Sequence, residues 1–252
     1  MSKKTLLELV QSILNDLDSD YVNSINDTEE ARQVATTIKS CYEELISNRN
    51  WPHLKKLIQL DASGTTSKPN YLKIPDAVKE LESIKYDCRK LGETKKQYKD
   101  IKYKYPDEFL DYIYQRDSDK DNIIEVSDFS GVPLLIQNDI APSYWTSFDD
   151  VYVVFDSYDA SVDTTLQKAK TQTLAVVETE WEMTDDFIPN LPSEAFSLLE
   201  EESKSVCFLN LKQMPNQKAE QKAGRQSRWL SRKAWKAHGG VRYDDYGRQS
   251  RK

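Results

Sequence analysis

Residues 70–86 read NYLKIPDAVKELESIKY, and this stretch decides the fold that we expect for the chain. Its two segments, Tyr71–Ile74 and Glu80–Tyr86, alternate apolar and polar residues, and turn-forming residues lie between them. Alternation with a period of two is typical of a strand that buries one of its faces. The stretch therefore predicts two strands at the start of a sheet-rich region.

The sheet-rich region extends through the middle of the chain. Ten of the fourteen tyrosines lie between Tyr71 and Tyr158, among β-branched residues and turn formers. The pattern predicts strands at Tyr71–Ile74, Glu80–Tyr86, Asp100–Tyr103, Ile123–Val126, Leu134–Asn138 and Asp150–Phe155. It also predicts a short helix from Pro106 to about Tyr114, and it leaves Lys168–Trp181 open as a strand or a helix.

Helical patterns lie on both sides of this region. Thr5 and Glu8 have the spacing of a capping box, and an apolar stripe follows them to Leu17. A second stripe begins near Asp27 and runs to Asn50, and a third long helix follows the segment 191–194 and ends near Lys212. Helices are therefore expected to flank a strand-rich centre.

Composition excludes several classes of protein. The chain has 252 residues, of which 38% are hydrophobic and 31% charged, so it can bury a sizeable core. Its three cysteines, Cys41, Cys88 and Cys207, exclude a disulfide scaffold and a four-cysteine zinc module, and they fit a reducing cytosol. No apolar run is long enough for a membrane helix, and the N-terminus leads into an amphipathic pattern. We expect a soluble protein without membrane contact.

Little in the sequence favours catalysis. The histidines are His53 and His238, and none of the seven glycines has the spacing of a phosphate-binding loop. Acidic runs at 149–150, 185–186 and 200–202 are candidate metal ligands for a hydrolase, but such runs are more often solvated faces. We therefore expect a protein that is not an enzyme and needs no cofactor.

A weak metal candidate lies between the predicted helix at 106 and the next strand. Asp117, Asp119 and Asp121 imitate the first positions of a calcium loop, with Asp128 at the twelfth position. Asn122 replaces the glycine that the sharp turn needs, and Asp128 replaces the bidentate glutamate. The pattern favours a solvated acidic turn over a metal site.

The C-terminal residues carry a charge opposite to that of the rest of the chain. Residues 212–252 hold twelve Lys/Arg and three Asp/Glu, a net charge of +9, so the other 211 residues carry −16 of the total of −7. Such a tail suggests an anionic partner.

The residues of the tail that we expect to bind a partner are Lys218, Lys222, Arg225, Arg228, Trp229, Arg232, Lys233, Trp235 and Lys236. Basic residues interleaved with tryptophan fit a phosphate backbone and equally a groove on a protein. The apolar stripe of 216–237 is thin, so we expect this segment to need a partner to become ordered.

Several segments together resemble a known family. They are the helix from Ala31 that closes on Arg49-Asn50-Trp51, the strand pair within 70–86, Tyr103 through Phe109, and the run Trp181–Pro192 that enters the long C-terminal helix. Over about residues 20–212 the chain resembles the head-to-tail adaptor family of short-tailed bacteriophages, also called tail tubular protein A or head completion protein.

The resemblance implies a fold of class α+β: a helical bundle built from N-terminal and C-terminal helices, with a β-rich central insertion and a long basic C-terminal arm. It divides the chain into N-terminal helices of the bundle (1–60), a β-rich central region (61–190), a long C-terminal bundle helix (191–212) and a basic docking arm (213–252).

The function that the resemblance implies is structural. Members of the family form a ring, typically dodecameric, beneath the portal at the capsid vertex, and this ring joins the capsid to the tail and lines part of the DNA channel. The implied partners are the portal protein, a tail tube or nozzle protein, further copies of the chain, and DNA that passes through without specific binding. The implied location is the head–tail junction of a virion made in the bacterial cytoplasm. An acidic body would repel DNA phosphates from such a channel.

The alternative that the residues leave open is a DNA-binding accessory protein that uses the basic tail to coat phosphates. That alternative predicts duplex binding that weakens steeply with salt and disappears without the tail.

Overall fold

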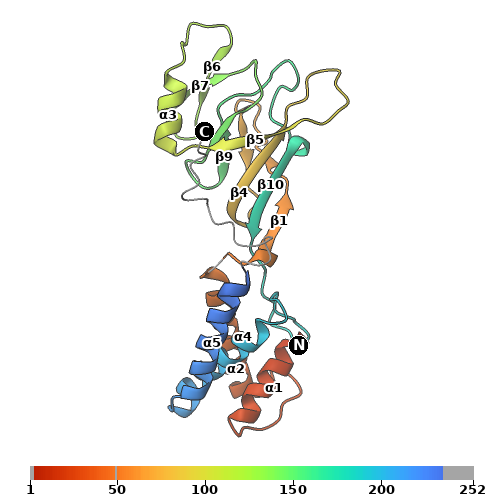
Figure 1. Ribbon diagram of the computed structural model, residues 1–252, viewed down its shortest axis with the longest axis vertical. Helices are drawn as coiled ribbons and strands as arrows, with labels where there is room; N and C mark the ends of the chain where they lie inside the picture. Colours follow the sequence, from red (N-terminus) through yellow and green to blue (C-terminus); the bar gives the residue numbers. More distant parts are fainter. Residues whose placement is uncertain (1–2, 49, 235–252) are drawn as a thin grey trace, which may run out of the picture. The chain divides into compact units, whose positions relative to one another are not determined.

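The computed structural model describes residues 3–48 and 50–234, which fall into two compact units (Figure 1). The helical unit lies within the segments Met1–Leu54 and Thr179–Lys252. The sheet unit is Lys55–Glu178. The units therefore meet in sequence at 54/55 and at 178/179, whereas the predicted boundaries lie at 60/61 and 190/191.

The described helices of the helical unit are α1 (Leu6–Asp16), α2 (Glu29–Ser47), α4 (Phe196–Lys212) and α5 (Gln217–Ala234), with a 3₁₀ turn, η1 (Pro52–Leu54). Helix α4 contacts α1, α2 and α5, and it therefore holds the unit together. The predicted capping box is confirmed, because the Thr5 hydroxyl accepts from the Glu8 N–H and the Glu8 carboxylate accepts from the Thr5 N–H. None of the helices in the part of the chain that the structure describes is both long and apolar enough to cross a membrane.

The start of α2 differs from the prediction by one residue. Thr28 is the N-cap, and its hydroxyl accepts from the Ala31 N–H at 3.1 Å. The carboxylate of Asp27 accepts instead from the N–H groups of Asn23 and Ser24. Asp27 therefore stabilises the turn before the helix and does not cap the helix. Asp is favoured in such turns as well as at N-cap positions.

The sheet unit contains an eight-stranded curled sheet with the order β1-β10-β4-β5-β8-β9-β3-β2. These strands are β1 (Lys55–Ile58), β2 (Asp61–Ala62), β3 (Tyr71–Lys73), β4 (Val78–Asp87), β5 (Tyr98–Tyr103), β8 (Tyr144–Thr146), β9 (Tyr152–Phe155) and β10 (Thr171–Val177). Neighbouring strands are antiparallel except β5 and β8, which are parallel. The segment that the sequence left open as strand or helix is strand β10, preceded by the 3₁₀ turn η2 (Lys168–Lys170).

The connection between β5 and β8 contains helix α3 (Pro106–Tyr114) and a separate two-stranded hairpin of β6 (Ile123–Ser127) and β7 (Pro133–Gln137). Pro106 stands at the first helical position, where its missing N–H costs no hydrogen bond. Phe109 and Ile113 of α3 are fully buried in the core of the sheet unit. The other buried members of this core include Tyr71, Leu72, Ile84, Ile136, Val153 and Phe155.

The predicted fold class is wrong. The chain is an α+β protein in which a large eight-stranded curled sheet forms a compact unit with its own core, so that the helices are not the element that organises the whole fold. The predicted arm is also wrong for its described part, because residues 217–234 form helix α5, which packs on α4. Helical stripes and capping residues predict single helices, but they do not state which element organises the fold.

Candidate partner-docking surface

Helix α5 contains most of the residues that the sequence singled out. Its Lys, Gln, Ala and Arg residues are good helix formers. The Asn216 side chain accepts from the Ala219 N–H at 3.1 Å, as an N-cap residue does. The predicted docking residues Lys218, Lys222, Arg225, Arg228 and Trp229 all lie on this helix. A single rigid element therefore positions them.

One face of α5 is buried within the helical unit. Ala219, Ala223 and Leu230 are 3%, 1% and 5% exposed. The expectation that this stripe is too thin to anchor the segment is therefore wrong. Small alanine side chains let two helices approach closely, so that backbone and stem atoms supply the contact that large side chains would otherwise supply.

Polar contacts also fix α5 against α4. Lys222 forms an ion pair with Glu201, which is 8% exposed, and the Gln226 amide donates to the Ser197 hydroxyl at 2.7 Å. Lys222 therefore stabilises the contact between the two helices and also contributes to the docking surface. Ser197 and Gln226 had no signal in the sequence, and Glu201 was noted only as part of an acidic run, since the role of all three depends on which helix α5 meets.

The outer face of α5 is cationic. Lys218, Arg225 and Arg228 are exposed, and Trp229 is 51% exposed. The Nε atoms of Arg225 and Arg228 donate to carbonyls one turn back in the same helix, Gln221 and Gly224, which holds both guanidinium groups along the helix surface. Neither arginine forms an ion pair with a carboxylate among the described residues. Their charge is available to a partner.

A shallow groove of about 550 Å³ runs beside this face. It is lined by Glu194 and Ser197 from the start of α4 and by residues of α5, namely Lys222, Arg225, Gln226 and Trp229. An aromatic side chain flanked by arginines is the composition of an interface hot spot. The groove therefore fits a segment of a partner that supplies carboxylates and an apolar side chain.

The remaining predicted docking residues are not described at the level of side chains. Arg232 and Lys233 lie in the last turn of α5. Trp235 and Lys236 lie outside the described residues, as does His238.

In the weak calcium candidate, carboxylates accept hydrogen bonds from nearby groups of the protein. Asp117, Asp119 and Asp121 lie in the turn before β6, where the Asp117 carboxylate accepts from the Asp119 N–H at 3.2 Å. Within residues 3–48 and 50–234 no three His, Cys, Asp or Glu side chains are grouped so that they could hold a metal ion. The predicted twelfth ligand, Asp128, accepts from the Tyr71 hydroxyl at 2.7 Å and from Ser130.

The hydrogen bonds to Asp128 control its ionisation. Partial burial acts to raise its pKa, but the hydrogen bonds from Ser130 and Tyr71 outweigh burial and lower the pKa to about 2. A carboxyl whose pKa is lowered on folding stabilises the fold above its unfolded pKa, and this contribution is lost as the pH falls toward the folded value. The pair therefore fastens the β6–β7 hairpin to β3 at neutral pH and weakens in acid.

Tyr71→Phe removes this contact without changing the core volume. We expect the variant to lower the free energy of unfolding by about 1–2 kcal/mol at pH 7, because the charged acceptor loses one donor. The deficit should shrink as the pH falls from 4 toward 2, where Asp128 becomes protonated in both proteins. Urea titrations at several pH values measure this. Tyr152→Phe is the control, because among the described residues the Tyr152 hydroxyl forms no hydrogen bond. If the loss in the free energy of unfolding of Tyr71→Phe does not change with pH, the hydrogen bond to Asp128 is not its cause.

The acidic runs weighed as hydrolase ligands are engaged in local structure. Asp149 accepts from the N–H groups of Val151 and Tyr152, and Asp185 accepts from the Ile25 N–H at 2.8 Å. Glu200 accepts from Lys4 and from the Ser12 hydroxyl. These carboxylates therefore close turns and join helices.

His53 lies in η1, just after the end of α2. Its Nε2 lies 2.8 Å from the Asn190 carbonyl oxygen, and burial lowers the pKa of the ring. A neutral imidazole in this position joins the end of η1 to the segment before α4. It serves the packing of the helical unit.

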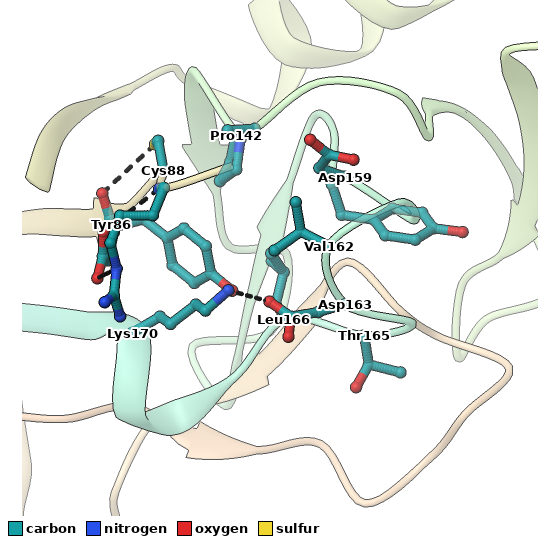
Figure 2. Close-up of a pocket in the computed structure, with 13 residues that line it drawn as sticks. Tyr86, Cys88, Pro142, Asp159, Val162, Asp163, Thr165, Leu166 and Lys170 are labelled. Carbon is teal, nitrogen blue, oxygen red and sulfur yellow. Dashed lines mark hydrogen bonds and ion pairs between the residues drawn. The ribbon is translucent and has the colours of Figure 1, made fainter. Parts of the chain in front are cut away.

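A small hollow lies in the sheet unit between the end of β4 and the segment that leads to β10 (Figure 2). Its volume of about 20 Å³ is room for one water molecule. Tyr86 accepts from the Gln167 N–H at 3.0 Å, and Lys170 forms an ion pair with Asp163. Burial raises the pKa of the Cys88 thiol and of the Tyr86 hydroxyl, so both hold their protons at neutral pH. The hollow offers no space for an organic ligand and no activated nucleophile.

The segments that carry the family resemblance form parts of the structural core. Tyr71 and Leu72 are buried in β3, and Trp51 is 5% exposed beside η1. The ring of Trp181 packs on Tyr42 of α2 and on Phe187, with ring centroids 5.0 and 4.7 Å apart. These residues hold elements together. In comparisons with known proteins, the chain matches no protein-family model and no curated protein.

Proposed function

We propose that the chain is a structural virion protein that forms a head-to-tail adaptor ring beneath the phage portal. In this proposal it joins the capsid to the tail tube or nozzle and forms part of the channel through which DNA passes. It acts at the head–tail junction after synthesis in the bacterial cytoplasm, and it needs no cofactor. The family resemblance is the starting point, and the cationic outer face of α5 is the observation that supports docking.

The charge and the fixed position of α5 both favour docking. Lys218, Arg225 and Arg228 project from a helix whose opposite face is buried, so little backbone entropy is lost when a partner binds them. Trp229 and the groove beside it add apolar area next to these charges. Tryptophan and arginine dominate the binding energy of many protein interfaces. The partner that fits is an acidic surface with an exposed apolar side chain, and we assign it to the portal ring.

The test is cosedimentation with the purified portal ring of the same phage. The full chain should shift the portal peak stoichiometrically. Arg225→Glu combined with Arg228→Glu should weaken binding by about a hundredfold or more, since two hot-spot charges are reversed. Arg32→Glu combined with Lys56→Glu is the matched control, because it changes the charge equally at two exposed positions outside α5.

Two results would contradict the adaptor. One is no portal shift by the unaltered chain. The other is salt-sensitive binding of duplex DNA that the α5 variant alone loses, together with no portal binding, which would favour the DNA-binding accessory protein.

A further inference from the structure

The hairpin of β4 and β5 is strongly basic in a chain that is acidic overall. Residues 85–104 contain eight Lys/Arg and three Asp/Glu, a net charge of +5, whereas the whole chain carries −7. Six lysines of this hairpin are exposed and form no ion pair among the described residues: Lys85, Lys90, Lys95, Lys96, Lys99 and Lys102. Like charges gathered in this way repel one another in the free protein, and an anionic partner removes that cost.

The same unit carries an acidic surface of similar magnitude. Residues 106–128, which form α3, the following turn and β6, contain eight Asp/Glu and two Lys/Arg, a net charge of −6. Seven of these carboxylates are exposed and form no ion pair in the described part of the chain: Asp107, Glu108, Asp111, Asp117, Asp119, Asp121 and Glu125. We call residues 85–104 the basic hairpin and residues 106–128 the acidic face.

The tip of the basic hairpin and the acidic face lie on different sides of the sheet unit. In Figure 1 the connection between β4 and β5 extends to the right of the sheet, while α3 and the β6–β7 hairpin lie on its left. The acidic face is firmly held, because Phe109 and Ile113 are fully buried beneath it. The unpaired lysines at the hairpin tip therefore do not neutralise the carboxylates of the acidic face within one copy.

Opposite charges on different sides of one rigid unit fit a head-to-tail contact between copies. We infer that the basic hairpin of one copy docks on the acidic face of a second copy. Such a contact is heterologous, and its repetition gives a closed ring or an open filament. The inference deepens the proposed function and rests on it, since it names the surfaces that would join neighbours in the ring.

A second copy fits the basic hairpin better than a nucleic acid does. Asp100 lies directly across from Lys85 in the β4–β5 register, and Glu93 lies at the tip, so carboxylates interrupt the path that a phosphate backbone would follow. Leu91 at the tip is 79% exposed, which offers an apolar contact to a protein surface.

A charge exchange tests the pairing. Lys95→Glu combined with Lys96→Glu reverses the basic hairpin, and Asp119→Lys combined with Asp121→Lys reverses the acidic face. Each variant alone should raise the dissociation constant of self-association at least about tenfold. An equimolar mixture of the two should restore association, because each reversed surface then meets an opposite charge on the other variant. Sedimentation velocity over a range of concentrations, at about 0.05 and 0.5 M salt, measures this.

The control is again Arg32→Glu with Lys56→Glu, which should associate like the unaltered chain. The inference is overturned if the unaltered chain does not self-associate, if neither variant weakens association, or if the mixture stays dissociated. It is also overturned if the hairpin variant loses only salt-sensitive binding of duplex DNA.

The portal experiment separates this inference from the proposed function. Portal binding without charge-dependent self-association would overturn the inference alone. Restored association in the mixture, with no portal binding, would support the pairing of surfaces and overturn the adaptor.

Discussion

Arg116→Met should lower the free energy of unfolding by about 3–5 kcal/mol, because it strands a buried carboxylate. Asp156 is fully buried, and Arg116 Nη2 lies 3.1 Å from its Oδ2. The same guanidinium donates to the carbonyls of Leu135 and Asp156. It therefore joins the end of α3 to β7 and to the end of β9. Methionine keeps much of the stem volume but supplies none of these donors.

The other carboxylate oxygen of Asp156 makes the effect larger. Its Oδ1 accepts from the N–H groups of Ser143 and Tyr144 at 2.9 and 2.8 Å. The carboxylate therefore cannot rotate toward solvent without breaking these hydrogen bonds at the start of β8. Loss of the guanidinium also removes the N–H donors to the carbonyls of Leu135 and Asp156, which costs further stability.

Urea denaturation at neutral pH measures the change. Lys168→Met is the matched control, since it breaks the exposed ion pair with Asp61 and should cost less than about 1 kcal/mol. If Arg116→Met costs no more than this control, the buried pair does not stabilise the sheet unit as described.

The single helices and strands were predictable because their signals are local. The capping box of Thr5 and Glu8, the proline before Phe109 and the alternation in 70–86 each specify backbone geometry within a few residues. The segment 168–181 was ambiguous because the apolar residues 174–177 are consecutive and show no alternation, although β10 buries mainly one face. The register shifts between Leu174 and Ala175 and between Val176 and Val177 interrupt the two-residue period.

The way in which these elements assemble was not predictable from the same signals. The stripe of Ala219, Ala223 and Leu230 is too weak to specify a partner, and its burial depends on Glu201 and Ser197 of another helix. The role of Arg116 was also invisible, because Asp156 lies forty residues away in sequence.

The candidate surfaces were found only in part from the sequence. The cations of α5 stood out because they lie in a tail with few carboxylates. The basic hairpin did not, because a single sum over the first 211 residues hides a segment of +5 next to one of −6. A charge count in short windows would have found both segments, but only the fold separates them to different sides of one unit.

Phe109→Ala should lower the free energy of unfolding by about 3–5 kcal/mol, as deletion of a fully buried aromatic side chain does. Phe109 is 0% exposed, and its ring lies edge-on to Phe148 at a centroid distance of 6.3 Å. With Ile113 it is one of the two residues by which α3 is buried in the core. The cavity would therefore loosen the helix that presents Asp107, Glu108 and Asp111.

This consequence makes Phe109→Ala a test of both stability and the acidic face. Urea denaturation should show the loss, and self-association should weaken although no surface charge changes. Leu110→Ala is the control on the next residue of α3, which is only partly buried and should cost clearly less. A Phe109→Ala variant as stable as Leu110→Ala would contradict the anchoring of α3. A variant that is destabilised yet associates normally would show that the acidic face does not depend on how firmly α3 is held.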